Sequence, residues 1–461
     1  MINIVKLKTF LSMNISFRLF SILTLWSFVS VGQVKQVGDS LKLPFAIAKE
    51  KQLSEEDLAS KKEGMYVTGV PDISSDPVNG FGVGVEGSIF FNGKKSDPFF
   101  KYTPYRAEID LALFVTSKQQ KEIMLTVDVP YILNTKWRLR GELAYEINPN
   151  LLYFGINEKE TIPGLSYFPS GDSSQNMVHH ATYSAYESSL TGQNTFYHQY
   201  TKKEAILNIS MERSLYEGRI RLLAGYEIAK LNLSPFSGNS LLANDVQSGL
   251  IRGMGQNLVS FVQAGFIYDT RDLEGDPSSG VFAELTNELC LKALGSQFNF
   301  NKTFAHINVY QRLLPSSFKK LIFAARFSMG YTALDAPFYE YQDQWTSEGS
   351  IEGLGGGQTL RGFKQSRFLS KWMFFNNIEL RYRFGEMDLL KQHLAFSAVP
   401  FYDFGAVWDS GASMWHQNVQ NLRSNGGLGL RIAWNVNTIL RFDYAISKED
   451  KQFFFQIGHC F

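Results

Sequence analysis

The last nine residues of the chain read Phe453-Phe454-Phe455-Gln456-Ile457-Gly458-His459-Cys460-Phe461. Apolar side chains recur at every second position, and this pattern puts Phe453, Phe455, Ile457 and Phe461 on one face. A period of two is that of a β-strand with one face toward an apolar environment. A terminal aromatic ring suits a membrane–water boundary, where it is half buried. The ending therefore predicts the last strand of an outer-membrane β-barrel, with these four residues as its C-terminal barrel signal.

The same alternation runs along most of the chain. Leu111 and Leu113 share one face of a segment whose other face carries Glu108 and Asp110. Charged residues on such wet faces, Arg219 among them, are predicted to line the lumen. Sixteen segments with this pattern are predicted to be strands: 65–73, 81–91, 104–116, 121–131, 136–147, 199–213, 218–232, 257–269, 280–292, 300–312, 320–332, 372–384, 392–407, 426–435, 438–447 and 452–461. The predicted fold is all-β, a sixteen-stranded antiparallel transmembrane barrel.

The lengths of the connections support this count, because bacterial barrels alternate long outer loops with short periplasmic turns. With both termini in the periplasm, the long connections all fall outside: 148–198, 233–256, 333–371 and 408–425. The short turns all fall inside: 132–135, 214–217, 313–319, 385–391 and 436–437. An error of one strand between them would mix the two classes.

The N-terminus is typical of a secretory signal. Lys6, Lys8 and Arg18 precede an apolar run, and Ser30-Val31-Gly32 is a plausible cleavage site. We therefore divide the chain into a signal peptide at 1–32, a short charged periplasmic segment at 33–64 and a transmembrane barrel at 65–461. Within the charged segment, residues 53–62 are predicted to form a short helix with Ser54 as its N-cap.

The composition excludes several classes of function. Of the 45 Lys and Arg residues three lie in the signal, which leaves 42 against 44 Asp and Glu, a net charge of about −2. Nothing in this balance indicates a nucleic-acid partner. The predicted surroundings are those of a multi-pass barrel in the lipid of the bacterial outer membrane.

Histidines and cysteines give no sign of a metal site or a cofactor. His179, His180 and His198 fall in the third outer loop, but their spacing is not that of metal ligands. Cys290 and Cys460 fall in predicted strands that are distant in the sheet, and we interpret them as apolar residues rather than a disulfide. We expect no metal and no cofactor.

The sixth outer loop carries a glycine-rich stretch that runs from Gly353 to Phe363. No Lys follows its glycines and no βαβ context exists, so it is a poor phosphate loop. Glycines permit tight bends, and Arg361 can seek an acidic partner if the loop folds back into the lumen. Glu379 and Asp403 are in phase to point into that lumen from adjacent strands, so a guanidinium fork can engage one or both.

Several motifs together resemble the BamA/TamA-type outer-membrane barrels of the bacterial surface antigen family. The loop motif Leu360-Arg361-Gly362-Phe363 is similar to the sixth-loop motif of that family. The other motifs that carry the resemblance are Tyr-Asp-Thr-Arg-Asp at 268–272, Pro-Ser-Ser-Gly at 277–280, Asn-Ile-Glu-Leu-Arg-Tyr at 377–382, Phe-Tyr-Asp-Phe-Gly-Ala-Val-Trp at 401–408 and Gly-Leu-Gly-Leu-Arg at 427–431. They follow one another in the family's order over residues 260–461.

The resemblance implies a sixteen-stranded barrel with a weak seam between its first strand, which contains Pro71, and its last. It also implies that Arg361 reaches Glu379 and Asp403 inside the lumen. Family members insert or translocate proteins, and some move lipids. Most carry periplasmic POTRA domains, and residues 33–64 are too few to hold one. A POTRA-less variant that works with a periplasmic partner supplying a POTRA-like function is therefore expected.

Two other classes of function stay open from the residues alone. A passive, porin-like channel for small solutes is the alternative to insertion or transport of protein or lipid. A barrel-shaped hydrolase is a third reading, although no serine lies in a Gly-x-Ser-x-Gly elbow and paired lumen carboxylates need no catalytic explanation. We expect no enzymatic activity and name no catalytic residue.

Overall fold

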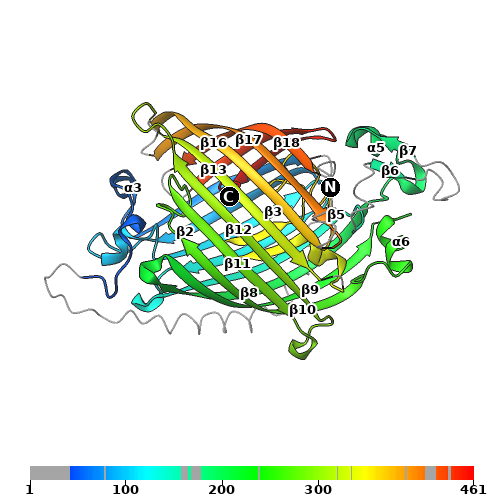
Figure 1. Cartoon of the computed structure of the whole chain (residues 1–461), viewed down its shortest axis with the longest axis horizontal. Coiled ribbons are helices and arrows are strands. Elements are labelled where there is room, and N and C mark those ends of the chain that lie inside the picture. Colours follow the sequence, from blue (N-terminus) through cyan, green and yellow to red (C-terminus); the bar gives the residue numbers. More distant parts are fainter. Residues whose placement is uncertain are drawn as a thin grey trace, which may run out of the picture. The chain divides into compact units, whose positions relative to one another are not determined.

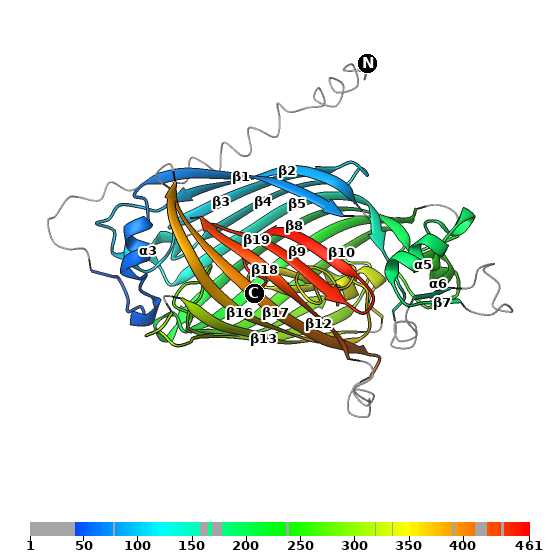
Figure 2. The ribbon, with the colours of Figure 1, turned by 90° about the horizontal axis from the view of Figure 1, so that it is seen from above.

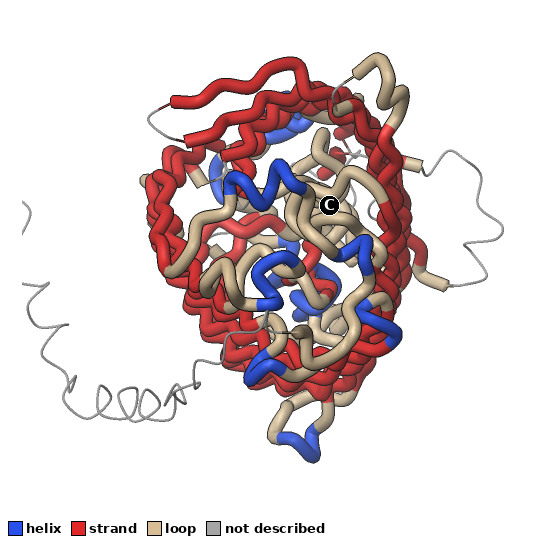
Figure 3. Tube along the Cα trace, turned by 90° about the vertical axis from the view of Figure 1, so that its left-hand side faces the viewer, coloured by secondary structure: helices blue, strands red, loops and turns tan. Residues whose placement is uncertain are grey.

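A computed structural model describes residues 42–76, 79–156, 165–167, 178–236, 239–318, 320–333, 335–389, 392–410, 422–434 and 438–461. The predicted signal peptide lies outside the described residues. Among the described residues a sixteen-stranded sheet holds each strand antiparallel to its neighbour in the chain. Figures 1 and 3 show this sheet curled around a central lumen. The fold is the predicted transmembrane β-barrel.

The strands of the barrel follow the sequence in order without crossovers. Their bounds are β1 Met65–Asp76, β2 Gly80–Phe91, β3 Ala107–Thr116, β4 Lys121–Val129, β5 Trp137–Leu152, β8 Gln199–Leu215, β9 Ile220–Pro235, β10 Gly255–Asp269, β11 Gly280–Cys290, β12 Phe300–Arg312, β13 Leu321–Thr332, β16 Trp372–Leu389, β17 Gln392–Trp408, β18 Arg423–Trp434, β19 Thr438–Ser447 and β20 Lys451–Ile457. All sixteen predicted strands are confirmed. β1 is longer than predicted, because it continues beyond residue 73 to Asp76; Pro71 pairs in register with Val85 of β2.

The strands form because their side chains alternate between two environments. Leu111, Leu113 and Val115 of β3 are outward-facing and exposed, as lipid-facing residues of an isolated barrel must be. Glu284 and Glu288 of β11 point inward and are buried. The alternation seen in the sequence thus separates a lipid face from a lumen face.

The two ends of the barrel differ. Long connections gather at one end, where β6 (Leu165–Tyr167) pairs with β7 (Val178–His180) and two helices lie, α5 (Tyr183–Ser189) and α6 (Leu241–Gln247). The other end, on the left of Figure 1, carries α3 (Glu55–Ser60) and mostly short turns, apart from residues 92–106 between β2 and β3. We call these the loop end and the α3 end. The predicted cap of α3 is confirmed, since Ser54 Oγ accepts a hydrogen bond from Asp57 N at 3.1 Å.

The remaining helical pieces are short 3₁₀ turns in the connections. They are η2 Lys49–Lys51, η3 Pro98–Lys101, η4 Ile132–Asn134, η5 Gly192–Asn194, η6 Tyr216–Gly218, η7 Lys292–Leu294 and η8 Phe338–Gln342. No helix in the described part of the chain has the length and apolar character needed to cross a membrane.

The end of the chain departs from the prediction. β20 stops at Ile457, and Gly458 turns the chain at φ +86°. Phe453, Phe455 and Ile457 keep the outward positions of the predicted barrel signal, opposite Tyr444, Phe442 and Leu440 of β19. Phe461 was predicted to lie at the membrane boundary, and this is wrong: its ring stacks near Tyr310 and the Arg326 and Arg381 guanidiniums. Cys460 is likewise in the lumen rather than in a strand.

The first and last strands meet at a seam. β1 has 12 residues and β20 has 7, and the two lie side by side without a hydrogen-bonded ladder among the described residues. A strand of 7 residues is shorter than the roughly 9–11 that cross a bilayer. Figure 2 shows the blue and red ends of the sheet on the two sides of this seam. The described sheet therefore has its two ends at the predicted seam, but the short strand there is β20 and not the Pro71-containing β1.

Candidate functional site

The connection from β13 to β16, residues 333–371, folds into the lumen, and we call it loop 6. Its apolar side chains Leu354, Leu360 and Phe363 pack with Met373 and Phe375 of β16 in one buried cluster. Burial of this kind holds a loop that would otherwise be solvated, at roughly 25 cal/mol per Å² of apolar surface. The predicted entry of the loop into the barrel is what the structure shows.

Two glycines let the backbone of loop 6 take this path. Gly355 adopts φ +116°, and a Cβ there would lie 2.2 Å from the carbonyl oxygen of Lys364. At Gly362 a Cβ would lie 2.5 Å from the Cβ of Asn425 on β18. Only glycine fits both places, because a side chain would meet backbone or a neighbouring strand.

Arg361 stands at the centre of the site and is fully buried. Its Nε and Nη2 donate to the two carboxylate oxygens of Asp403 at 2.9 and 2.7 Å. Its Nη1 donates to Glu379 Oε1 at 2.7 Å. The guanidinium also lies 3.5 Å from the centre of the Phe401 ring. The structure thus brings together the loop arginine and both acidic residues that the sequence had placed in the lumen.

The cluster contains four further residues whose place in it was not predicted from the sequence. Arg361 Nη1 also donates to Asp443 Oδ2 on β19 at 3.0 Å, and Arg431 Nη1 donates to Asp443 Oδ1 at 2.6 Å. Arg381 Nε donates to Glu379 Oε2 at 2.9 Å. With Arg441, whose Nε lies 3.9 Å from Asp443 Oδ2, four guanidinium groups therefore face three carboxylates, so each carboxylate has a cation beside it. The alternation of side chains placed Asp443 and Arg431 on the lumen face, but it could not predict how far along the barrel axis they lie.

Two amides complete the site. Asn377 Nδ2 donates to Asp403 Oδ1 at 2.8 Å and to the Thr359 carbonyl of loop 6 at 2.7 Å. Asn425 Nδ2 donates to Asp403 Oδ2 at 2.8 Å. Asp403 therefore has both oxygens saturated by donors from loop 6 and two strands. A buried, satisfied network of this kind fixes one arrangement of the loop against β16–β19.

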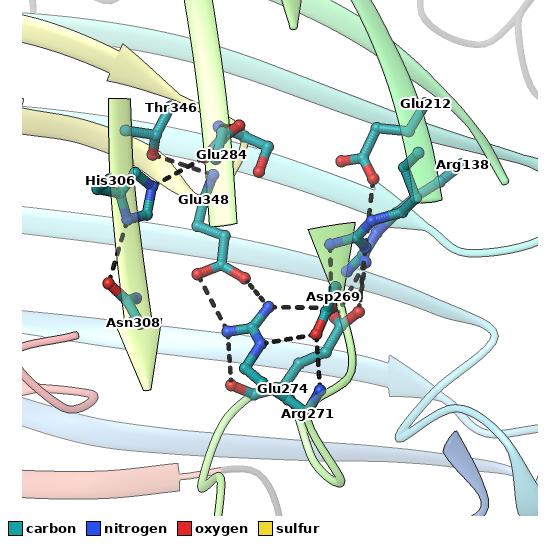
Figure 4. A network of polar contacts seen from close by, with 12 residues as sticks. Arg138, Glu212, Asp269, Arg271, Glu274, Glu284, His306, Asn308, Thr346 and Glu348 are labelled. Atoms are coloured by element: carbon teal, nitrogen blue, oxygen red, sulfur yellow. Dashed lines mark hydrogen bonds and ion pairs between the residues drawn. The ribbon is translucent and has the colours of Figure 1, made fainter. Parts of the chain in front are cut away.

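Loop 6 makes a second contact inside the barrel, through a hairpin of β14 (Asp343–Thr346) and β15 (Gly349–Glu352). Arg271 Nη2, in the turn after β10, lies 2.5 Å from Glu348 Oε1 at the tip of this hairpin. Ser347 N donates to Glu284 Oε1 at 2.9 Å, and Glu284 Oε2 lies 3.1 Å from His306 Nε2. Figure 4 shows this network. The Tyr-Asp-Thr-Arg-Asp motif thus holds the hairpin, a role that its sequence did not reveal.

The C-terminal tail, residues 458–461, lies beside loop 6. Cys460 Sγ approaches the Gly357 and Gln358 carbonyl oxygens at 3.7 Å. Arg381 Nη2 donates to the Phe461 carbonyl oxygen at 2.8 Å, and His459 Nε2 lies 3.1 Å from Asp276 Oδ1. The tail therefore ties the last strand to loop 6 and to the turn after β10.

The rest of the lumen is hollow. A cavity of about 1000 Å³ is lined by side chains of β3–β5, β8 and loop 6, among them Glu108, Glu142 and Lys202. Arg219 is not among its lining residues, so the prediction that it lines the lumen is wrong. Its side chain is 39% exposed at the α3 end and pairs with Glu50 and Glu217.

The histidines and cysteines have ordinary neighbours. His198 is buried, with Nδ1 2.8 Å from the Tyr153 carbonyl oxygen and Nε2 against the Tyr186 hydroxyl. Both cysteines are free thiols, as predicted. Among the described residues no group of three or more His, Cys, Asp or Glu side chains is arranged to hold a metal ion.

Comparison with known families decides the relationship. Residues 107–461 match the Omp85 superfamily domain. The chain belongs to the Omp85 superfamily. The predicted kinship with BamA/TamA-type barrels is thereby confirmed. Residues 43–106 match a domain of unknown function, DUF5982. In the structure that region contains α3, β1 and β2, so the first two strands of this Omp85 barrel fall within it.

Several solved structures are similar to this Omp85 barrel. BamA from Haemophilus ducreyi lacking POTRA domains 1–3 is 14% identical, with 86% of this chain and 70% of that chain covered and a TM-score of 0.48. CdiB from Escherichia coli is 9% identical, with 86% and 62% covered and a TM-score of 0.49. CdiB from Acinetobacter baumannii is also 9% identical, with 86% and 59% covered and a TM-score of 0.44. A comparison with curated proteins found no match.

Proposed function

We propose that this Omp85 barrel resides in the bacterial outer membrane and aids the insertion or transport of protein, or of lipid, there. Its α3 end faces the periplasm and its loop end the outside. The observation that carries the proposal is the Arg361 cluster, which anchors loop 6 to Glu379, Asp403 and Asp443 beside the seam. Membership of the Omp85 superfamily supports it.

The seam supplies the place where a polypeptide engages. β1 has a partner only on its β2 side within the described sheet, so its other edge presents backbone donors and acceptors. An extended segment can add to such an edge through main-chain hydrogen bonds. β20 lies beside that edge without a hydrogen-bonded ladder in the described sheet, and its chain turns into the lumen at Gly458. The Arg361 cluster includes Asp443 of β19, the neighbour of β20, and thereby links loop 6 to the seam.

The experiment is an insertion assay with the protein reconstituted in liposomes. The rate at which an unfolded outer-membrane barrel protein inserts is compared for wild type, Arg361→Gln and Lys202→Gln. Lys202 is a matched lumen cation that pairs with Glu146 and Glu204 on the cavity wall. Wild type and Lys202→Gln should accelerate insertion, and Arg361→Gln should lose most of the acceleration. No acceleration by wild type, or equal acceleration by all three proteins, would overturn the proposal.

A periplasmic partner that supplies a POTRA-like function is part of the proposal. Residues 42–64 hold only η2 and α3 and lie against the turns of the barrel. Co-purification from outer membranes should recover a protein with periplasmic repeats. We propose no cofactor, no nucleic-acid partner and no enzymatic activity.

A passive channel is the second candidate, because the cavity of about 1000 Å³ can hold water and small solutes. Planar bilayer recordings separate the two functions. A large, steady conductance that survives deletion of residues 354–365 supports the channel. Small, irregular openings in the wild type that become large after this deletion support a barrel closed by loop 6.

A further inference from the structure

Residues 42–64, which fall largely within the domain of unknown function, lie along the α3 end of the barrel. Ala48 N donates to the Glu217 carbonyl oxygen at 2.9 Å, and Leu53 N donates to the Lys101 carbonyl oxygen at 2.8 Å. Phe45 packs against Phe99 and Tyr131, with ring centres 5.6 Å apart in both pairs. The segment therefore contacts the turns after β2, β4 and β8. Figure 3, which views this end, shows loops and short helices across the opening.

Lys51 links this segment to a buried carboxylate of the barrel. Its Nζ lies 3.0 Å from Asp269 Oδ1, and its side chain is 13% exposed while that of Asp269 is fully buried. Asp269 also accepts from Arg271 Nε at 3.1 Å, and Arg271 reaches Glu348 of the loop 6 hairpin at 2.5 Å. A continuous line of ion pairs thus joins the N-terminal segment to loop 6.

The charges of this region balance only when Lys51 is counted. One network of ion pairs, with all distances at or below 3.6 Å, links five carboxylates and five cations: Asp128, Glu212, Asp269, Glu274 and Glu348 with Lys51, Arg138, Arg140, Arg221 and Arg271. Removal of Lys51 leaves Asp269 with one cation fewer in a buried place. An uncompensated buried charge is strongly unfavourable, so the network favours the docked segment.

The network is also a partition between two cavities. A cavity of about 60 Å³ lies beneath the N-terminal segment, next to Lys51 and Leu53. The large lumen cavity of about 1000 Å³ lies on the other side. Both are lined by Pro104, Arg138, Arg271, Leu273 and Glu274. The N-terminal segment and the network are therefore two successive layers between the α3 end and the lumen.

We infer that residues 42–64 are a removable seal over this entrance, with Lys51 as the residue that holds the seal and couples it to loop 6. The line Lys51–Asp269–Arg271–Glu348 makes the position of the segment and that of the loop 6 hairpin depend on one another. A periplasmic partner that draws the segment away would remove one cation from the network and loosen the hairpin. The inference concerns access to the lumen and does not depend on what the barrel transports.

The test uses the full chain in lipid nanodiscs with Leu273→Cys as reporter and both native cysteines replaced by alanine. A membrane-impermeant maleimide then measures access to the partition. Lys51→Glu should raise the labelling rate at least about tenfold, because it sets a carboxylate against Asp269. Lys49→Glu, on the same turn but exposed, should leave the rate unchanged. A disulfide between Ala48→Cys and Glu217→Cys should suppress labelling in both backgrounds.

The outcomes separate the two parts of the inference. Equal labelling in wild type, Lys49→Glu and Lys51→Glu would show that the segment is no seal. Fast labelling in Lys51→Glu together with wild-type labelling in Glu348→Gln would overturn the coupling to loop 6. Folding of each variant is judged by heat-modifiable gel mobility. If Lys51→Glu does not fold, Lys51→Met replaces it, and this variant should also raise the labelling rate. Unchanged labelling in a folded Lys51→Met would contradict the seal, whatever the insertion assay shows.

Discussion

The Arg361 guanidinium and the Asp403 carboxylate form a two-pronged ion pair at 2.9 and 2.7 Å, and both side chains are fully buried. This pair joins a loop to a strand 42 residues later. A bidentate pair fixes orientation as well as distance, so it holds loop 6 in one position. The stability of loop 6 inside the lumen therefore depends on this ion pair.

Removal of the arginine should destabilise the barrel. Arg361→Gln leaves the fully buried Asp403 without the arginine that pairs with it, and a loss of about 3–5 kcal/mol in the free energy of unfolding is expected. Lys202→Gln should cost less than about 1 kcal/mol, because its side chain is 21% exposed and screened by water. Urea unfolding in lipid measures both. Equal losses would show that Arg361 has no special role.

The glycine of the loop motif should tolerate no side chain. In Gly362→Ala the new Cβ would lie 2.5 Å from Asn425 Cβ and 3.0 Å from Ser447 Cβ, so loop 6 must move away from β18 and β19. A cost of about 1–3 kcal/mol is expected from this overpacking. Gly141→Ala is the control, because nothing lies within 4 Å of a Cβ there. Thermal midpoints that fall equally in the two variants would argue against the close approach.

The fold of the C-terminal tail should depend on Gly458. A valine at φ +86° is strained by about 1–2 kcal/mol, whereas an extended conformation would continue the alternation of β20 and release the tail from the lumen. In Gly458→Val the thiol of Cys460 should therefore react with a maleimide about tenfold faster than in wild type. Cys290, which is fully buried in β11, is an internal control. An unreactive Cys460 in the folded variant would refute this view of the tail.

The docking of residues 42–64 should respond to pH through Lys61. Its ammonium donates to the Phe100 and Thr103 carbonyl oxygens at 2.7 Å, and burial lowers the pKa of Lys61 from 10.5 to about 8. Below pH 8 the lysine is charged whether docked or free, so the penalty for burying the charge is fully present. Between pH 8 and 10.5 the docked lysine loses its proton before the free one, and docking should strengthen as pH rises.

A spin label at Glu55→Cys, with both native cysteines replaced by alanine, tests this pH response. The mobile fraction of the label should fall as pH rises from 8 to 10.5. Lys61→Met should abolish the trend, and Lys62→Met, an exposed neighbour, should keep it. A mobile fraction that rises with pH, or a trend that persists in Lys61→Met, would contradict the burial of Lys61.

The barrel itself was predictable because its signal is local. Alternation along a strand sorts each side chain to lipid or lumen, and the long and short connections fix the parity of strands. The same alternation put Glu379 and Asp403 in the lumen. It did not place Asp443 with them, because the height of a residue depends on the register between β18 and β19, which the sequence does not display.

Three other features depend on contacts between distant parts of the chain. The turn at Gly458 lies within a segment whose alternation is interrupted only by His459, so the pattern predicted a strand to Phe461. The hairpin β14–β15 is held by Arg271 and Glu284, far away in sequence. The pairing of Arg219 with Glu50 moves that arginine from the predicted lumen to the α3 end. Local periodicity contains no information about such partners.

We propose that the barrel engages a polypeptide at the seam between β1 and β20. A photo-reactive phenylalanine analogue at Phe453 of β20, which is 56% exposed, tests it most directly. The same analogue at Phe266 of β10, which is 44% exposed, is the matched control away from the seam. Adducts with an outer-membrane protein precursor are expected at position 453 and none at position 266. Equal adducts at both positions, or none at 453 during active insertion, would contradict it.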